Sequence, residues 1–340
     1  MADSAPTLLD VARIAGVSTA TVSRYFNTPD RVVPATREKV QRVVKELGYT
    51  PHFGGRALAS NRTNTIGAVI PTMDNSIFAR GLQAFQEGLV EAGVTLLVAS
   101  SNYDPEKELE QLQSLISRGA DGLLLIGEAR PKETYEFLKR RGIPYVIAWN
   151  HREDKDTHYV GFDNKSAARR MAEFVLSKGH RNIAMISGIT HYNDRAADRV
   201  AGVCEALAAA GLDIEEPEII EAAYSLEAGG EALSRLLEKT PPPTAVICGN
   251  DVLAVGAILK ARQLGKRVPE DISITGYDDI ELAEVIEPQL TTVHVPHKRM
   301  GYAAARLLLE LRDGKNARQS IEFETTIVER GSLGQIPPGK

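Results

Sequence analysis

Polar, charged and aromatic side chains gather directly after the short apolar runs that predict β-strands in the larger, C-terminal part of the chain. Amide, carboxylate and guanidinium groups can form paired hydrogen bonds to neighbouring hydroxyls, and an aromatic ring offers a flat face on which a sugar can stack. These side chains occupy residues 75–78, 102–104, 150–151, 192–199, 250–251 and 277–279. Taken singly, each also suits a structural role, as Asn250 and Asp251 would in capping the helix that follows them. The set predicts a binding site for a small polar ligand such as a sugar.

A second group, of hydroxyl-bearing and basic residues, lies near the N-terminus at the start of a short helix predicted over 19–26. Serine and threonine hydroxyls can bond phosphates or base edges, the Ala20 methyl can meet a thymine methyl, and Arg24 can reach a guanine or a phosphate. These residue types therefore suit DNA binding. A three-helix core without a DNA role is the alternative, although a unit of about 50 residues buries little apolar surface.

Three short helices are needed to position that second group. Apolar residues at helical spacing predict the first helix over 8–15, Gly16 ends it, and Ser18 is a natural N-cap for the second. The third helix begins at Pro34 and is closed by Gly48. The tight turn between the first two helices predicts a helix-turn-helix unit, whose second helix enters the DNA major groove by its N-terminal end.

Strand and helix signals alternate along the rest of the chain. Strands are predicted at 66–71, 94–99, 122–126 and 144–149, with helices between them, and the same order repeats from residue 182 onward. The repeat has a period of about 120 residues. It predicts an α/β fold of two lobes, each a doubly wound parallel sheet, in which ligands bind beyond the carboxyl ends of the strands.

Composition and charge narrow the class of protein. The 340 residues are 43% hydrophobic and 25% charged, which is typical of a globular chain of about two domains. Residues 1–62 hold nine Lys/Arg and five Asp/Glu, whereas the remainder holds 31 and 40, so a small basic head precedes an acidic body. The two cysteines exclude a disulfide scaffold and suit a reducing compartment. No apolar run approaches the roughly 20 residues of a membrane span, and the polar N-terminus does not resemble a signal peptide, so we expect a cytoplasmic protein.

Motifs for catalysis or metal binding are weak. The sequence contains neither a G-x-x-x-x-G-K phosphate loop nor a G-x-S-x-G elbow, and we expect no cofactor. His294 and His297 flank a proline and are interpreted as surface histidines rather than a metal pair. A sugar-modifying enzyme on the same fold is the alternative function. It would need an acid–base pair, for which Asp104, Asp163 and Asp278 are candidates, but it would leave the basic head unexplained.

The head resembles that of a known family. Two segments are similar to the N-terminal part of the LacI/GalR family of bacterial repressors, namely TLLDVARIAGVSTATVSRYFN at 7–27 and VVPATREKVQRVVKELGYTP at 32–51. The resemblance implies DNA contacts by Ser18, Thr19, Ala20, Thr21, Ser23, Arg24 and Asn27. Among these, Thr19 and Ala20 would read bases, and their short side chains differ from those of the lactose repressor, so its operator sequence is not expected here.

The polar segment 51–65, rich in glycine, serine and arginine, is typical of a flexible linker. In the resembled family it folds into a hinge helix on operator DNA. The resemblance implies that Leu58 wedges a base step apart in the minor groove and that Arg56 lies near a phosphate. Gly54 and Gly55 stand where the family has better helix formers, and each costs a helix about 1 kcal/mol relative to alanine. We therefore expect a larger ordering penalty for this hinge.

The body is similar to the effector domain of the same family and, through it, to periplasmic sugar-binding proteins. The resemblance and the charge pattern together predict effector contacts by Phe78, Asn150, Arg195, Arg199, Asn250 and Asp278. Asn150 stands where sugar-responsive members often carry aspartate, and Arg195 adds a positive charge near Arg199. An anionic effector, a sugar acid or sugar phosphate, is therefore favoured over a neutral sugar. The segments VGFDN and DVLAVGA look closest to the gluconate-responsive branch.

We therefore expect a homodimeric, sequence-specific DNA-binding transcriptional regulator, a repressor of carbohydrate or sugar-acid catabolism genes controlled by a small-molecule effector. Its partners would be double-stranded operator DNA and the effector, with no membrane contact. The expected domains are a head at 1–50, a hinge at 51–65, a body at 66–334 and a tail at 335–340. Within the body, 66–164 with 295–322 would form the N-lobe, and 165–294 with 323–334 the C-lobe. The alternative is a sugar-binding or sugar-modifying α/β protein whose head does not read DNA.

Overall fold

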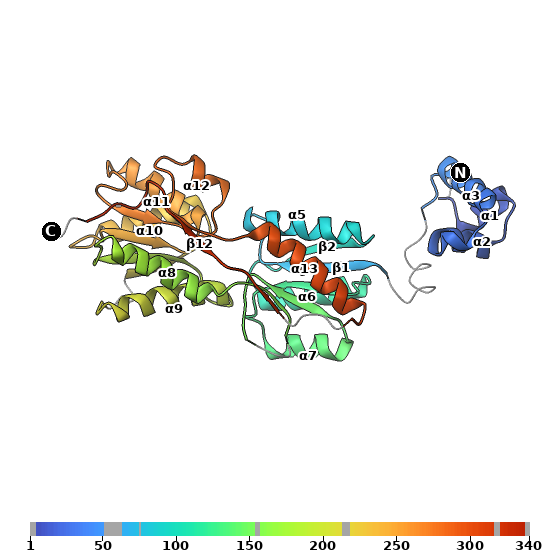
Figure 1. Ribbon diagram of the computed structural model, residues 1–340, viewed down its shortest axis with the longest axis horizontal. Helices are drawn as coiled ribbons and strands as arrows, with labels where there is room; N and C mark the ends of the chain where they lie inside the picture. The colour runs from blue at the N-terminus through green and yellow to red at the C-terminus, as the bar shows by residue number, and fades with distance from the viewer. Residues whose placement is uncertain are drawn as a thin grey trace. The chain divides into compact units, whose positions relative to one another are not determined.

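Figure 1 shows the protein as a computed structural model. The structure describes residues 5–50, 63–74, 76–153, 157–212, 218–315 and 320–336. Two compact units make up the chain, Met1–Asn64, here called the head, and Thr65–Lys340, called the body. Among the described residues, no helix has both the length and the apolar character that crossing a bilayer requires.

The head is built from three helices and one 3-10 turn: α1 (Leu8–Ala15), α2 (Thr19–Asn27), η1 (Pro29–Arg31) and α3 (Pro34–Leu47). Thr7 and Asp10 cap α1 reciprocally, because each accepts the backbone N–H of the other. Gly16 has a φ of 63°, which ends α1 in the left-handed region and turns the chain tightly toward α2. Ser18 then accepts the N–H of Thr21 at 3.2 Å and begins α2. The core consists of Val11, Ala12, Ala15, Val22, Val40, Val43 and Tyr49. The predicted helix-turn-helix unit is confirmed.

The N-lobe of the body contains a six-stranded parallel sheet in the order β11-β5-β4-β3-β1-β2. Its strands are β1 (Thr65–Ile70), β2 (Thr95–Ser100), β3 (Leu123–Ile126), β4 (Tyr145–Ala148), β5 (Tyr159–Gly161) and β11 (Ser320–Glu322). Its helices are α5 (Ser76–Glu91), α6 (Pro105–Ser117), α7 (Lys132–Arg141) and α13 (His297–Arg312). Alternate side chains of β3 explain the layers: Leu124 and Ile126 pack with α5 and α13, whereas Leu123 and Leu125 pack with α6 and α7.

The C-lobe repeats this arrangement with a four-stranded parallel sheet in the order β7-β6-β8-β9. The strands are β6 (Ile183–Gly188), β7 (Ile219–Ala222), β8 (Ala245–Cys248) and β9 (Ser273–Thr275). The helices are α8 (Asn164–Ser177), α9 (Asp194–Ala209), α10 (Leu226–Leu237), α11 (Asp251–Gln263) and α12 (Glu281–Val285). Side chains of β6 again divide the layers, since Met185 packs with α8 and α9 and Ile186 with α10 and α11. The two doubly wound lobes predicted from the internal repeat are therefore confirmed.

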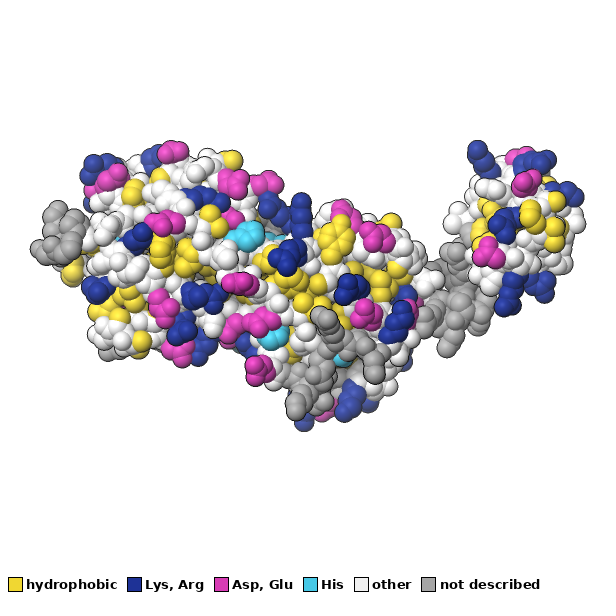
Figure 2. Space-filling view, in the orientation of Figure 1, with side chains coloured by type: hydrophobic (Ala, Val, Ile, Leu, Met, Phe, Trp, Pro, Cys, Tyr) yellow, Lys and Arg dark blue, Asp and Glu magenta, His cyan; other side chains and the backbone are white. Residues whose placement is uncertain are grey.

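The chain crosses between the lobes after β5, after β10 (Thr292–His294) and after β11. β10 pairs antiparallel with β12 (Thr326–Val328), and the helix that follows β10, α13, packs against α5 in the N-lobe. Figure 2 shows basic and acidic side chains interspersed over the visible face of the body, and basic side chains at several points on the head. The parallel strands of both lobes place their carboxyl ends at the region between the lobes, where the polar side chains predicted for a ligand gather.

Candidate ligand cleft and nucleic-acid interface

Three adjoining cavities lie between the lobes. The largest, of about 390 Å³, is called the outer chamber; the others are the inner chamber, of about 10 Å³, and the side pocket, of about 20 Å³. The inner chamber is lined by Ile77, Phe78, Tyr103, Trp149, Asn193, Arg195, Arg199, Tyr224, Asn250 and Asp278. Five of the six predicted effector residues are thus brought to one chamber. Asn150 is the sixth and does not line it.

Arg199, on α9, is buried and held from several directions. Its Nε donates to Oδ1 of Asn164 at 3.0 Å, and its Nη1 donates to the carbonyl of Gly249 at 2.6 Å. The guanidinium carbon lies 3.8 Å from the centre of the Tyr277 ring. Nη2 lies 3.6 Å from Oδ1 of Asp278 and donates no hydrogen bond within the described chain. A buried cation requires such partners, and the remaining donor is available at the inner chamber.

Asp278 is a buried carboxylate whose Oδ1 accepts no hydrogen bond from the described residues. Burial raises its pKa to about 6, although Arg199 and Arg195 both act to lower it. Its φ of 104° is unusual for a residue other than glycine, and such backbone strain persists only where the surroundings impose it. Asp278 therefore presents an unused hydrogen-bond acceptor to the inner chamber, beside two arginines.

Two residues at the start of α11 position the chamber. Oδ1 of Asn250 accepts the N–H of Leu253 at 2.9 Å and so caps the helix, while its amide nitrogen donates no hydrogen bond within the described chain. Asn250 is therefore both a cap and a lining residue. Asp251 does not line the chamber: it is buried, and it accepts hydrogen bonds from Ile280 N at 2.8 Å and Thr292 Oγ1 at 2.5 Å. These bonds fix the turn after β9 that carries the site aspartate. Burial raises the pKa of Asp251 well above its ordinary value.

Asn150 forms part of a seam between the lobes. Its Nδ2 donates to Oδ2 of Asp194 at 2.6 Å, and the same oxygen accepts the backbone N–H of Glu128 at 2.9 Å. Oδ1 of Asp194 pairs with Arg195 at 3.1 Å. A side chain at Gly127 would collide with the Arg195 guanidinium, which shows that this arginine reaches the N-lobe. The neutral Asn150 therefore does not leave this region free of negative charge, because Asp194 supplies a carboxylate in contact with it.

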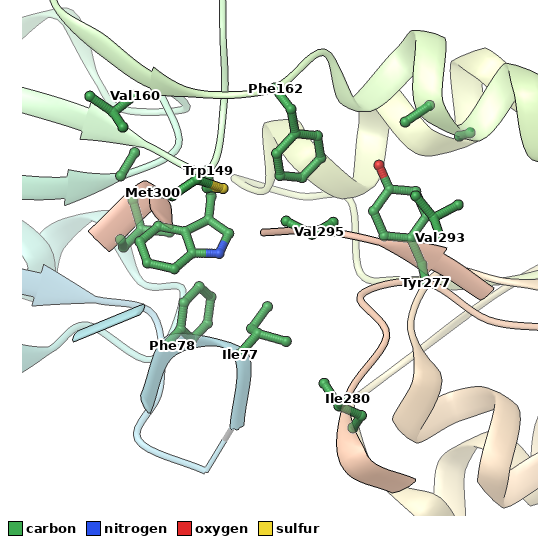
Figure 3. Packing of buried hydrophobic residues seen from close by; sticks show 14 of the residues in the cluster. Ile77, Phe78, Trp149, Val160, Phe162, Tyr277, Ile280, Val293, Val295 and Met300 are labelled. Atoms are coloured by element: carbon green, nitrogen blue, oxygen red, sulfur yellow. The ribbon is translucent and has the colours of Figure 1, made fainter. Parts of the chain in front are cut away.

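Trp149 and His297 connect the N-lobe to the turn that carries Asp278. The indole Nε1 of Trp149 donates to Nδ1 of His297 at 3.1 Å, and Nε2 of His297 lies 3.2 Å from the carbonyl of Asp278. Because Nδ1 accepts, the proton resides on Nε2, and burial lowers the pKa of His297 to about 3. Trp149 also packs edge-on against Phe78, with ring centres 5.8 Å apart (Figure 3). The interpretation of His297 as a surface histidine is wrong, whereas the His294 side chain is 47% exposed.

Sequence reasoning missed two residues that line the inner chamber, Trp149 and Tyr224. Trp149 was assigned to the strand that precedes Asn150, whereas Tyr103 lay within the predicted segment 102–104. Tyr224 lies two residues after Ala222, the observed end of β7. The rule that residues after strand ends line the cleft includes Tyr224 once the strand is taken to this end.

The candidate nucleic-acid interface of the head lies at the N-terminal half of α2. Five of the predicted residues are exposed, namely Ser18, Thr19, Ala20, Arg24 and Asn27, and two are half-buried, Thr21 and Ser23. Ser18 and Thr21 bond each other through their hydroxyls at 2.9 Å, and Asn27 donates to Ser23 at 3.2 Å. Arg24 forms no ion pair within the described residues, so its charge is available to a phosphate or base. The predicted hinge residues Arg56 and Leu58 lie outside the described residues.

A helix-turn-helix head on a two-lobed body with a polar ligand cleft defines a DNA-binding transcriptional regulator with a small-molecule effector domain. Residues 7–52 match the sequence profile described as "Bacterial regulatory proteins, lacI family", and residues 172–333 match that of a "Periplasmic binding protein-like domain". The chain belongs to the LacI family of bacterial transcriptional regulators.

Relatives match along nearly the whole chain. The HTH-type transcriptional repressor PurR of Erwinia tasmaniensis is 35% identical over 335 residues, which cover 97% of this chain and 98% of that protein. The crystal structure of a LacI-family regulator from Silicibacter pomeroyi superposes with a TM-score of 0.89 at 30% identity, covering 97% of this chain and 100% of the other. The Lac repressor dimer, solved bound to operator and the anti-inducer ONPF, has a TM-score of 0.85 at 25% identity, with the same coverage.

We predict that the stability contribution of Asp278 depends on pH. Its pKa is raised from 3.8 to about 6 in the folded protein, so the folded state binds this proton more tightly than the unfolded state does. The wild type should therefore lose stability relative to Asp278→Asn as pH rises from about 4 to about 6. At 1.36 kcal/mol per pKa unit, the total is about 3 kcal/mol. Urea unfolding of the two proteins across this range measures the difference.

Asp271→Asn is the matched control for this measurement. Hydrogen bonds from Arg267 hold the pKa of Asp271 at about 2, below its ordinary value, so its effect has the opposite sign. The wild type should gain stability relative to that variant as pH rises from about 2 to about 4. A difference between the wild type and Asp278→Asn that stays constant at every pH would show that Asp278 is not held in the environment described.

Proposed function

We propose that the chain is a repressor whose affinity for operator DNA is set by an anionic, polyhydroxylated small molecule, a sugar acid or sugar phosphate, bound in the cleft by the residues that line the inner chamber. Its target genes would then be those that consume such compounds. The observation that carries the proposal is the pairing, in one buried chamber, of two arginines with unused donors and an aspartate with an unused acceptor.

The donors suit an anion. Nη2 of Arg199, Nε and Nη2 of Arg195 and Nδ2 of Asn250 donate no hydrogen bond to the described residues, and all three side chains line the chamber. Guanidinium groups bind carboxylates and phosphates in a paired, charge-assisted geometry. With Asp278 as the one acidic side chain in the described lining, positive charges outnumber negative charges there. This support replaces the argument from Asn150, which the contact with Asp194 removes.

The acceptor suits a hydroxyl. An ionised Asp278 has no proton to donate, so its unused oxygen requires a donor from the ligand. A neutral apolar ligand would leave this oxygen unpaired in a buried site, at a cost of about 1 to 3 kcal/mol. A molecule that carries both an anionic group and hydroxyls meets the arginines and the aspartate together.

The alternative, a sugar-modifying enzyme, has less support. Two of the three carboxylates that it would need are helix caps: Asp104 accepts the N–H groups of Glu106 and Lys107, and Asp163 accepts that of Ser166. Neither lines the inner chamber, where Asp278 is the carboxylate. An acid–base pair of the required kind is therefore not assembled among the described lining residues.

For DNA, we propose that α2 of each subunit of a homodimer lies in the major groove, where Thr19 and Ala20 face bases and Arg24 contacts a base or phosphate. Ser18, Thr21, Ser23 and Asn27 would bind phosphates. Two-fold symmetry then implies a near-palindromic operator. The roles of Arg56 and Leu58 in a hinge that kinks the operator remain part of this proposal.

Arg195→Met tests the ligand side. The full-length protein is unfolded thermally with gluconate, glucuronate, glucose 6-phosphate, glucose and adenine, and operator affinity is measured with each. A ligand at 100 times its Kd adds about 2.7 kcal/mol of stability. We expect anionic compounds to stabilise the wild type and Arg195→Met to weaken their binding roughly tenfold to a hundredfold, because a hydrogen bond to a charged group contributes about 1.5 to 3 kcal/mol.

Arg169→Met is the control. Arg169 pairs with Glu173 on the exposed surface of α8, so this substitution removes the same charge away from the cleft. It should bind the anions as the wild type does. Stabilisation by glucose or adenine alone, with no effect of any anion, contradicts the proposed effector class while leaving the family assignment intact.

Arg24→Ala tests the DNA side. The operator is first obtained by selection from random duplexes with the wild-type protein, and binding is then followed by fluorescence anisotropy. We expect Arg24→Ala to lose about 1 to 3 kcal/mol of affinity for the selected site and to tolerate base changes that the wild type rejects. Lys45→Ala, which removes the same charge from α3, should weaken binding less and equally for all sequences. Equal losses in the two variants, with unchanged base preference, would show that Arg24 reads no base.

A further inference from the structure

Tyr103 occupies the point where all three cavities of the cleft meet. It lines the outer chamber, the inner chamber and the side pocket. Burial raises the pKa of its hydroxyl, Tyr224 acts in the same direction, and Arg195 and Arg199 act in the opposite one. Tyr103 follows β2 and so belongs to the N-lobe, whereas the charged and aromatic groups that act on its hydroxyl belong to the C-lobe.

The backbone holds this ring in place. Asn102 and Tyr103 have φ values of 54° and 60°, in the left-handed region that residues other than glycine rarely adopt. The loop is fixed on both sides: Ser101 donates to the carbonyl of Ile70 at 3.0 Å, and Asp104 caps α6. Consecutive strained residues between two anchored ends occur where function requires a side chain at one place, as in ligand clamps.

Tyr103 lines two chambers of very different character. On the inner side lie the arginines and Asp278, in a chamber of only about 10 Å³. On the outer side lies a chamber of about 390 Å³, lined in part by Ile189, Ala222 and Ala223 and by no lysine or arginine of the described chain. Of the three cavities between the lobes, the outer chamber alone reaches the size of roughly 300 Å³ at which small-molecule pockets begin. The charges proposed to recognise the ligand thus line the inner chamber, the room for its body is in the outer chamber, and Tyr103 lines both.

Tyr103 meets Tyr224 across the lobes. The centres of the two rings are 6.2 Å apart and their planes are tilted by 43°. At this separation no ligand ring fits between them, so a ligand in the outer chamber would contact the pair from the outside. Aromatic faces favour flat partners that cover them, whereas a flexible open chain loses more conformational entropy and covers the face poorly.

We propose that the effector has two parts, a closed ring that packs on Tyr103 in the outer chamber and an anionic group that extends past it to the arginines. Tyr103 would then be a ligand-contacting residue that determines specificity, selecting cyclic sugars bearing a carboxylate or phosphate over open-chain sugar acids. This inference rests on the proposed function, of which it specifies the effector class.

The test compares probes that differ in one feature. Glucuronate and galacturonate are cyclic, and L-gulonate and L-galactonate are the open-chain acids obtained when the C1 aldehyde of each is reduced to an alcohol, which leaves the carboxylate and the other carbons unchanged; glucose is a cyclic, neutral reference. Calorimetry on the full-length protein gives the affinities. Trp149, the single tryptophan of the chain, lines the inner chamber, so its emission reports independently whether that chamber is entered.

We expect at least one cyclic acid to bind tenfold or more tightly than its open-chain counterpart and than glucose. Tyr103→Ala should reduce the affinity for that acid to the open-chain level and leave the open-chain affinity unchanged, whereas Tyr103→Phe should retain the preference. If Tyr103→Ala fails to fold, Tyr103→Leu replaces it. Leucine keeps most of the bulk without the flat face, and the same loss of preference is expected. Tyr302→Ala, on the outer surface of α13, is the control and should behave as the wild type.

The outcomes separate this inference from the proposed function. Open-chain acids that bind as tightly as the cyclic ones, and more tightly than glucose, overturn the role of Tyr103 but support an anionic effector. Binding of glucose in preference to every acid overturns both. The inference also fails if Tyr103→Ala retains the preference, or if no cyclic acid binds.

Discussion

The buried positive charge of Arg199 is the constraint on which the cleft depends. A guanidinium removed from water must be compensated, and its partners come from the start of α8, the turn after β8 and the turn after β9. One arginine therefore ties together three segments, the start of α8 and the turns that follow two strands of the C-lobe. The compensation is incomplete, because Asp278 faces Arg199 at 3.6 Å and keeps an unused oxygen. An unpaired buried donor and acceptor lower the stability of the folded protein, and such a cost is typical of a site that binds a ligand.

Residues of the ligand site also take part in contacts that join the two lobes. The carbonyl of Asp278 is bonded through His297 to Trp149 in the N-lobe, and Asp194, paired with the chamber residue Arg195, accepts hydrogen bonds from Asn150 and Glu128 across the seam. A ligand that binds Asp278 or Arg195 would therefore act on groups that join the two lobes. It can change operator affinity only by as much as it prefers one arrangement of the lobes to another, so under the proposed function these contacts would be the physical basis of regulation.

Much of the site could be predicted because parallel strands end at one edge of a sheet. That rule located Arg199, Asn250 and Asp278 from the sequence, although they are separated by up to 79 positions. Side chains whose roles depend on the opposite lobe could not be found in this way. Asn150 meets Asp194 and His297 meets Trp149 only after the lobes have packed, and no local pattern specifies such pairs. The same rule included Tyr103 in the segment 102–104, but its position at the junction of three cavities follows from the backbone of one strained loop and could not be predicted.

The most direct test of the account is the affinity of the tightest-binding sugar anion for the full-length protein, measured by calorimetry with and without saturating selected operator. If the charged cleft governs DNA binding, the two affinities differ by at least fivefold, operator affinity changes by the same factor when the anion is added, and Arg195→Met abolishes the difference. Equal affinities on and off the operator would contradict the account, because a ligand that binds both states alike cannot regulate.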